Sequence, residues 1–341
     1  MMHVMKLVPR IAIDFGSTSI RAIAEGQSLD RLFSDRSLLV RNVNSDDVVV
    51  IGEAAEDHIL SPGEELINPI QHGVMVDYKG AVSILEHAIR QVSSWWHVFK
   101  PQVVMPESLE LSSAVSQALG EAVQEAGGGK IYMTPIPALA ALGAKINPRE
   151  STGNFIIDIG GGSTEAAIIS RGSVVSGLSA QIGGNDLIDS LITYLENTHA
   201  VDVSRRAAAD IIESAGSALN RDNDGIYDFY ANEIKTGEAK VLSISGNQIA
   251  DIISKPLQRI VSVASSLIRR TPTTLLSDIA ENGITVTGGL GRLYHIDTFL
   301  KRELALPVHI IENPENAVIT GGKEALKFIP VYERSVPRLN T

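Results

Sequence analysis

The stretch Phe155-Ile156-Ile157-Asp158-Ile159-Gly160-Gly161-Gly162-Ser163-Thr164-Glu165 decides the fold of this chain. It opens as an apolar, β-branched run, which predicts a buried strand that ends near Asp158. Glycines let the backbone turn sharply, and successive N–H groups in such a turn form a concave anion site. A carboxylate at the strand end can hold a hydrated Mg²⁺ that contacts phosphates. The stretch therefore predicts a metal–polyphosphate site, and the alternative is an ordinary glycine hairpin.

A second copy of this plan lies near the N-terminus, in Ile11-Ala12-Ile13-Asp14-Phe15-Gly16-Ser17-Thr18-Ser19-Ile20. It too has an apolar strand, an aspartate, a glycine and hydroxyls, followed by another apolar strand. Two matching hairpins far apart in the chain predict two similar domains. Each domain would present one phosphate hairpin to a shared cleft.

The composition is that of a globular protein and narrows the classes of function. The chain has 341 residues, enough for two domains of ordinary size. Its net charge of -11 argues against a general nucleic-acid binder, because no basic excess is present to neutralise a phosphate backbone. The absence of cysteine excludes disulfides and thiolate metal sites, and a reducing, cytosolic setting fits it. No apolar run reaches the length of a membrane span, and residues 1–8 are too short and too weakly charged for a signal peptide.

A third glycine turn follows a short apolar strand late in the chain. Ile284 to Val286 is predicted to be a buried strand that runs into Thr287-Gly288-Gly289-Leu290-Gly291. Before it, Ile234 to Ile244 looks strand-like, Ser245 to Asn247 looks like a turn, and a long helix is predicted from Leu257 to Arg269.

Both tryptophans of the chain lie in one short segment. Trp95 and Trp96 stand close to Val98 and Phe99, between a predicted helix end and Pro101. Aromatic side chains in a loop suit a protein interface or the headgroup layer of a membrane. The alternative is that both rings fold inward as core.

These motifs together resemble the actin-like ATPase superfamily, which also holds the heat-shock chaperone ATPases and sugar kinases. Within it, the chain is most similar to the MreB family of bacterial rod-shape filament proteins, from Ile11 to about Leu326. Asp14 to Ile20 is similar to the first phosphate motif and Asp158 to Glu165 to the second. Thr287 to Gly291 is similar to the adenosine motif, although Leu290 stands where the family usually has a third glycine.

The resemblance implies an α/β fold with actin-like (ribonuclease H-like) duplicated domains around a central nucleotide cleft. Domain I would comprise residues 1–145 and 318–341, with a small subdomain at about 31–76. Domain II would comprise residues 146–317, with a small subdomain at about 186–255.

The resemblance also implies ATP and Mg²⁺ as ligands. Asp14 and Asp158 would hold the Mg²⁺ through water, and Glu213 lies near the family's ribose-contacting position. Gly288 and Gly289 would let the adenosine approach the backbone. The phosphates would be bound by Gly16, Ser17, Thr18, Gly160, Gly161, Gly162 and Ser163.

One departure from the family bears on catalysis. In the MreB family a glutamate that positions the attacking water precedes the proline of an alanine-rich helix, and Ile136 stands at that position here. Isoleucine can neither accept a proton nor orient a water. Ser163 keeps a hydroxyl where the family has a threonine, so Asp158 and Ser163 remain the expected catalytic residues. The helix before Gly216 also lacks the family's lysine, and its glutamate is shifted by one position.

The resulting hypothesis is a divergent MreB-like protein that binds ATP and polymerises into membrane-associated filaments supporting cell shape, with slow or absent hydrolysis. Its expected location is cytoplasmic, on the inner face of the cell membrane. Its expected partners are copies of itself, that membrane and cell-shape or membrane proteins, with no nucleic acid. The family's membrane-inserting loop corresponds to the segment of Trp95, Trp96, Val98 and Phe99. The alternatives are a phosphohydrolase similar to exopolyphosphatase or guanosine pentaphosphatase, and a non-polymerising ATP-dependent membrane scaffold.

Overall fold

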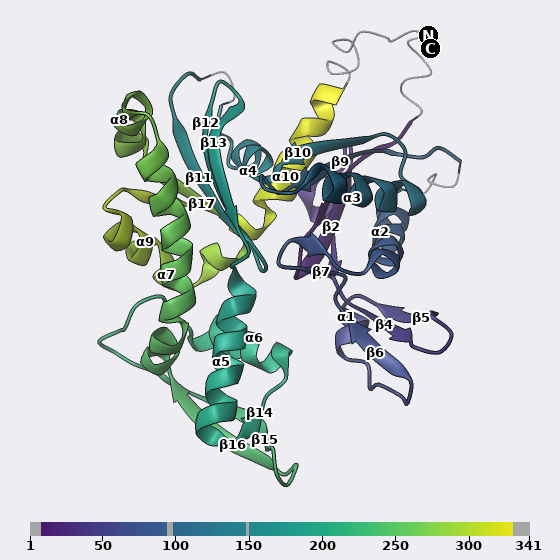
Figure 1. Cartoon of the computed structure of the whole chain (residues 1–341), viewed down its shortest axis with the longest axis vertical. Coiled ribbons are helices and arrows are strands. Elements are labelled where there is room, and N and C mark those ends of the chain that lie inside the picture. Colours follow the sequence, from purple (N-terminus) through teal and green to yellow (C-terminus); the bar gives the residue numbers. More distant parts are fainter. Residues whose placement is uncertain (1–7, 94–97, 148–149, 330–341) are drawn as a thin grey trace. The chain divides into compact units, whose positions relative to one another are not determined.

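The computed structural model describes residues 8–93, 98–147 and 150–329, and the chain divides into two compact units (Figure 1). Unit 1 takes in the described residues of 1–150, 171–174 and 316–341. Unit 2 takes in those of 151–170 and 175–315.

Unit 1 is built on a five-stranded mixed sheet with the order β10-β9-β1-β2-β3. Strand β1 pairs antiparallel with β2 and parallel with β9, which pairs parallel with β10. The strands are β1 (Arg10–Phe15), β2 (Ser19–Ala24), β3 (Phe33–Arg36), β9 (Gln102–Glu107) and β10 (Ile131–Pro135). Its helices are α1 (Glu53–Glu56), α2 (Tyr78–Val92), α3 (Ser113–Glu125), α4 (Ile136–Gly143) and α10 (Ala317–Ala325). Helix α2 packs against β2, and α10 packs against β1 and, closely, against α4.

Unit 2 repeats this plan with the order β13-β12-β11-β17-β18. Strand β11 pairs antiparallel with β12 and parallel with β17, which pairs parallel with β18. The strands are β11 (Asn154–Ile159), β12 (Thr164–Ser170), β13 (Ser173–Ala180), β17 (Ile284–Thr287) and β18 (Val308–Ile310). Its helices are α5 (Gly184–His199), α6 (Arg205–Ala215), α7 (Gly246–Arg270), α8 (Thr273–Asn282) and α9 (Ile296–Leu304). The shared order and pairing agree with the predicted duplication.

Each unit also carries a smaller antiparallel sheet. In unit 1 its order is β5-β4-β6, from β4 (Leu39–Asn42), β5 (Val48–Ile51) and β6 (Glu64–Ile67). A two-stranded hairpin follows, β7 (Ile70–Gln71) and β8 (Val74–Met75). In unit 2 the order is β14-β15-β16, from β14 (Val201–Asp202), β15 (Ile226–Glu233) and β16 (Ala239–Ser245). Short 3₁₀ turns complete the described chain at Leu29–Arg31, Gly289–Arg292, Pro314–Asn316 and Leu326–Phe328.

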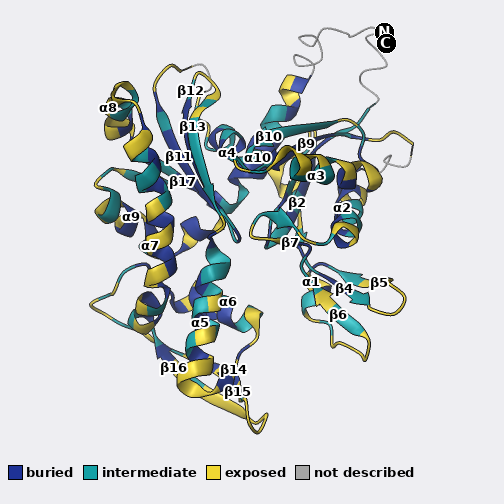
Figure 2. Ribbon diagram, in the orientation of Figure 1, coloured by how far each residue is buried: buried dark blue, intermediate teal, exposed yellow. Residues whose placement is uncertain are grey.

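The central strands of both large sheets are buried, as their apolar sequences predict (Figure 2). Ile11 and Ile13 of β1 and Ile156 and Ile157 of β11 are at most 1% exposed. A strand covered on both faces favours continuous β-branched residues over alternation. This packing holds the strand ends, where the two hairpin turns begin, in rigid positions.

Two sequence-based element predictions need correction in the small sheet of unit 2 and after it. The predicted strand from 234 to 244 is confirmed over 239–244, which lie in β16, whereas 234–238 form the turn of the β15–β16 hairpin. Ser245 does not belong to a turn: it is the N-cap of α7, its Oγ accepting from the Gln248 backbone N at 3.2 Å. The Gln248 side chain accepts in return from the Ser245 N–H, a capping box that starts the helix eleven residues before the predicted Leu257.

Candidate phosphate-binding hairpins and adenosine turn

The first hairpin turn joins β1 to β2 and leaves two backbone donors unused. The Gly16 N–H donates to the Ser19 carbonyl at 3.0 Å and closes the turn. Among the described residues, none accepts a hydrogen bond from the N–H of Ser17 or Thr18. Buried or half-buried donors of this kind are normally satisfied, and adjacent backbone N–H groups are the kind of donor that anion sites use.

Side chains from the next segments of unit 1 hold this turn. The Ser37 Oγ donates to the Gly16 carbonyl at 2.7 Å, and the Asn68 Nδ2 donates to the Ser17 carbonyl at 2.7 Å. The Ser17 hydroxyl, which is nearly buried, accepts from the Gly73 N–H at 2.9 Å. The turn carbonyls are thus bonded to the body of the unit.

The carboxylate of the first hairpin has a cationic neighbour. Asp14 and Arg21 are direct cross-strand partners, and Arg21 Nη1 lies 3.6 Å from Asp14 Oδ2. Burial raises the pKa of Asp14 above its ordinary value, and the charge and hydrogen bond of Arg21 oppose that rise. A second cation beside Asp14 would favour its ionised form further.

The second hairpin turn joins β11 to β12 with the same backbone geometry. The Gly160 N–H donates to the Ser163 carbonyl at 2.9 Å. In the described part of the chain, the N–H groups of Gly161, Gly162 and Ser163 meet no acceptor. This turn therefore offers three free donors where the first offers two.

Backbone groups of helix α5 hold the second turn. The Gly184 N–H donates to the Gly160 carbonyl at 3.0 Å, and the Asn185 N–H donates to the Gly161 carbonyl at 2.7 Å. Gly183 must be glycine because a Cβ there would lie 2.5 Å from the Gly160 oxygen. The segment from Ile182 to Asp186, which the sequence marks as a turn into a helix, thus supports the hairpin.

Asp158 sits at the end of β11 among buried polar groups. The Thr287 Oγ1 donates to Asp158 Oδ1 at 2.7 Å. The cross-strand partner of Asp158 is Glu165, which is fully buried and whose carboxylate accepts a hydrogen bond from the Ser179 Oγ at 2.7 Å. Asp158 is 7% exposed, and the bond from Thr287 fixes the orientation of its carboxylate.

The third glycine turn lies directly against the second hairpin. Gly288 follows β17 with a φ of +86°, and a Cβ on it would lie 2.3 Å from the Ile159 carbonyl oxygen. Its neighbour Gly289 has ordinary backbone geometry, and a Cβ there would meet no atom within 4 Å. The fold therefore requires the first glycine, whereas a Cβ at the second would point into open space.

The remaining predicted residues are placed as follows. Glu213 is exposed on α6, and Ile136 is the half-buried first residue of α4. Val98 and Phe99 are 54% and 40% exposed. Trp95 and Trp96 lie outside the described residues.

The donor set fits magnesium bound mainly through water and phosphate. Within residues 8–93, 98–147 and 150–329, no three histidine or carboxylate side chains converge as a metal-binding group. Mg²⁺ is commonly bound through one or two carboxylates plus waters and phosphate oxygens. Asp14 and Asp158, each beside free N–H donors, match that chemistry.

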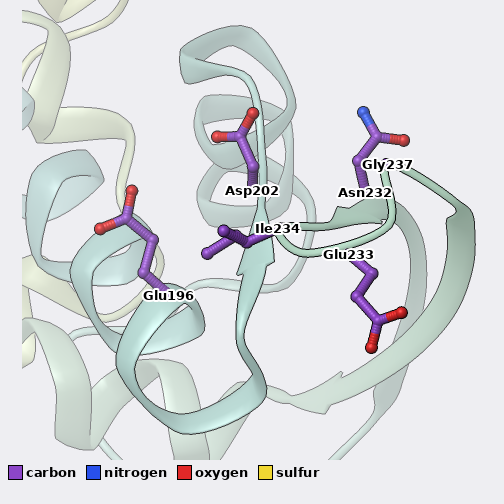
Figure 3. A pocket seen from close by; sticks show the side chains of 6 residues that line it. All are labelled: Glu196, Asp202, Asn232, Glu233, Ile234 and Gly237. Atoms are coloured by element: carbon purple, nitrogen blue, oxygen red, sulfur yellow. The ribbon is translucent and has the colours of Figure 1, made fainter.

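A separate hollow of about 500 Å³ lies at the small sheet of unit 2 (Figure 3). It is lined by Glu196, Asp202, Asn232, Glu233, Ile234 and Gly237. Its three carboxylates would repel phosphate, and Lys240 is already bonded to Glu233. The hollow is therefore unsuited to a nucleotide phosphate chain.

A family model described as MreB/Mbl protein matches residues 8–334. The chain belongs to the MreB/Mbl family. It is 29% identical to the cell shape-determining protein MreB of Escherichia coli K12 over 329 residues, 94% of each chain. It is 26% identical to the cell shape-determining protein Mbl of Bacillus subtilis 168 over 313 residues, 91% of this chain and 93% of that protein.

Solved structures confirm the actin-like fold that the sequence predicts. MreB5 of Spiroplasma citri bound to ADP superposes with a TM-score of 0.90 at 27% identity, covering 97% of this chain and all of that one. The same protein bound to AMPPNP gives 0.88 at 28% identity, with 96% and 98% covered. The MamK double helical filament gives 0.75 at 15% identity, with 96% and 99% covered, a likeness of fold alone.

Sequence reasoning assigned no role to four residues that shape the site. Ser37, Asn68 and Thr287 hold the turns or the carboxylate, and Arg21 balances Asp14. Arg21 could have been found, because counting outward from the first turn places it opposite Asp14. Ser37 and Asn68 carry no local signal, since each reaches the turn from another segment.

Proposed function

We propose that this chain binds Mg-ATP and assembles with copies of itself into membrane-associated filaments that support cell shape. The observation that carries the proposal is the pair of matching hairpins, each with an aspartate beside unpaired backbone N–H groups. Membership of the MreB/Mbl family supports it, and so do the relatives named as cell shape-determining proteins. The family match does not favour the phosphohydrolase alternative.

Nucleotide binding would use both hairpins and the adenosine turn. The free N–H groups of residues 17–18 and 161–163 would bind phosphate oxygens, and Asp14 and Asp158 would hold the hydrated Mg²⁺. The metal would neutralise phosphate charge when bound. The open space at Gly289 would accommodate the adenosine, with Glu213 near the ribose. MreB5 of Spiroplasma citri, solved with ADP and with AMPPNP, supports a nucleotide as the ligand.

Hydrolysis would be slow because Ile136 cannot position water. Loss of a positioned acid–base group costs about 10²–10⁴ in rate. Asp158 and Ser163 would remain as the polar groups around the phosphates. Acidic side chains are also favoured in the first turn of a helix, so α4 can accept a glutamate at its first position.

The deciding experiment measures phosphate release and pelleting on one sample with Mg-ATP, for the wild type, Ile136→Glu and the matched control Ile136→Leu. We expect the wild type and Ile136→Leu to pellet with little phosphate release, and Ile136→Glu to release phosphate about 10² times faster or more. Brisk release by the wild type would contradict slow turnover. Release without polymer would support the phosphohydrolase.

The membrane contact is proposed at the segment around Val98 and Phe99. Both side chains are large, apolar and exposed. They belong to the segment in which the sequence predicts that Trp95 and Trp96 also contact the membrane. None of the helices in the described ranges has both the length and the apolar character to cross a bilayer. The proposed location is the inner face of the cell membrane, with membrane or cell-shape proteins as further partners.

Co-sedimentation with anionic lipid vesicles tests this contact. We expect the double variant Val98→Ser/Phe99→Ser to pellet several-fold less with vesicles, because it loses buried apolar area at the lipid surface. Ile59→Ser is the control, since Ile59 is 89% exposed elsewhere in unit 1. Equal loss in the control would refute a specific loop contact. Pelleting that depends on lipid but never on protein concentration would favour the scaffold alternative.

A further inference from the structure

The three carbonyl groups of the first hairpin turn all accept hydrogen bonds from outside the hairpin. Ser37 provides two of these bonds, from its Oγ to the Gly16 oxygen at 2.7 Å and from its N–H to the Thr18 oxygen at 3.1 Å. Asn68 provides the third, from Nδ2 to the Ser17 oxygen at 2.7 Å. Each carbonyl is therefore held in one direction.

A planar trans peptide points its C=O and N–H in opposite directions. The Gly16 carbonyl shares its peptide plane with the Ser17 N–H, so the bond from Ser37 also sets the direction of that donor. In the same way, the bond from Asn68 to the Ser17 carbonyl sets the direction of the Thr18 N–H. These are the two N–H groups of the turn that meet no acceptor among the described residues.

Both supporting side chains are themselves held in place. Ser37 follows β3 and is fully buried. Asn68 lies between β6 and β7, and its Oδ1 accepts from the Ile70 N–H at 3.1 Å. That second bond identifies which end of the amide is oxygen, so the NH₂ end must face the Ser17 carbonyl.

We propose that Ser37 and Asn68 are positioning residues for the phosphate chain of the bound nucleotide. They keep three partially negative carbonyl oxygens bonded to the protein and direct two N–H donors toward the phosphates. This inference rests on the nucleotide binding proposed above. It adds two residues that lie outside the phosphate and adenosine motifs and that act on the phosphates, not on the nucleoside.

The second hairpin provides an independent precedent within the same chain. There the N–H groups of Gly184 and Asn185 hold the Gly160 and Gly161 carbonyls. By the same peptide geometry, these two bonds also set the directions of the Gly161 and Gly162 N–H groups. In the described part of unit 1, the residues after β3 form no helix at the corresponding place, and the side chains of Ser37 and Asn68 supply the equivalent bonds.

The test measures the affinities of Asn68→Ala and Ser37→Ala for Mg-ATP, Mg-ADP and adenosine. Titration calorimetry and competition binding between these ligands provide the values. Each variant is expected to lose about 5- to 10-fold in affinity for ATP, the size of one hydrogen bond's net contribution. Adenosine affinity should not change, because adenosine has no phosphate. A general structural defect would weaken all three ligands equally, so that result would overturn the proposal.

Asn42→Ala is the matched control. Asn42 makes a similar local cap, with its Oδ1 accepting from the Asn44 N–H at 2.9 Å, but it does not touch the hairpin. It should keep wild-type affinity for all three ligands. If Ser37→Ala fails to fold because a buried hydroxyl is lost, the half-buried Asn68 decides the outcome by itself.

The wild-type measurement separates the two levels of the hypothesis. A wild type that binds no ATP would refute the proposed function and this inference with it. A wild type that binds ATP beside an Asn68→Ala variant that binds it equally well would refute the positioning role alone.

Discussion

The first and second hairpins have the same backbone geometry but are held by different kinds of group. In both, a glycine N–H closes the turn onto the carbonyl of the residue three positions later, at 3.0 and 2.9 Å. Side chains of Ser37 and Asn68 hold the first turn, whereas backbone N–H groups of α5 hold the second. The comparison teaches that one requirement, fixed carbonyls and free N–H groups, is met by two solutions with different sensitivity to substitution.

The aspartates of the hairpins also differ in their cross-strand partners. Asp14 stands opposite Arg21, a cation, and Asp158 stands opposite Glu165, a second acid. Like charges directly opposite each other are unfavourable, and a bound cation relieves that repulsion. We therefore expect the second hairpin to contribute more to magnesium binding than the first.

The largest expected effect is a loss of Mg²⁺-dependent ATP binding that is greater at one aspartate than at the other. Asp158→Asn should weaken Mg²⁺-dependent ATP binding by about 10–100-fold, the range for losing a group that supports a metal. Asp14→Asn should cost less, because Arg21 already balances its charge. Titration of Mg²⁺ at fixed ATP measures both. Equal losses would show that the cross-strand partner does not matter.

A proline at Gly184 is expected to have the next largest effect. Gly184→Pro removes the N–H that bonds to the Gly160 carbonyl and places a ring carbon against that oxygen, so the second turn must move. ATP affinity should fall about tenfold or more, since a bond is lost and a contact is added. Helix content by circular dichroism should be retained, because proline is tolerated in the first turn of a helix.

Gly184→Ala is the control for that variant. It keeps the N–H, and its Cβ would lie no closer than 3.8 Å to the Gly160 oxygen. Near-wild-type ATP affinity in this variant, beside a loss in Gly184→Pro, would assign the effect to the bond. A loss in both would assign it to the shape of the segment.

Identical substitutions in the two turns test how far the similarity goes. Gly16→Ala and Gly160→Ala would each place a Cβ 3.4 Å from the nearest atom, the carbonyl oxygen of Ser19 or Ser163. The fold tolerates that distance, so thermal stability should change little. ATP affinity should fall by similar factors, roughly fivefold, because the methyl group hinders close approach of phosphate. Factors that differ by more than tenfold would show that one hairpin dominates phosphate binding.

The smallest expected effect concerns the partner of Asp158. Thr287→Val removes the hydroxyl that donates to Asp158 while keeping the shape of the side chain. The free energy of unfolding should fall by about 1 kcal/mol, and Mg-ATP affinity by a few-fold. Chemical denaturation and calorimetry measure the two quantities. An unchanged affinity would show that the carboxylate is oriented without Thr287.

Local patterns predicted the parts of the site that are local in the chain. A β-branched run, an aspartate and a glycine turn follow one another in a few residues at both hairpins, and the structure has strands and turns there. Strand β15 was missed, although exposed and buried side chains largely alternate from Ile226 to Glu233, a pattern that indicates a half-buried strand. The start of α7 was missed because Ser-Gly-Asn resembles a turn, although Ser245 and Gln248 form a capping box.

The order of residues along the chain was enough to identify the duplicated hairpins, the family resemblance and the anomalous Ile136, since each depends on neighbours within a short motif. The tertiary structure alone revealed what holds the motifs in place. Ser37 and Asn68 reach the first turn across 21 and 51 positions, and Thr287 reaches Asp158 across 129. Such hydrogen bonds depend on how segments pack, and no periodicity or short motif records which distant donor a carbonyl will meet.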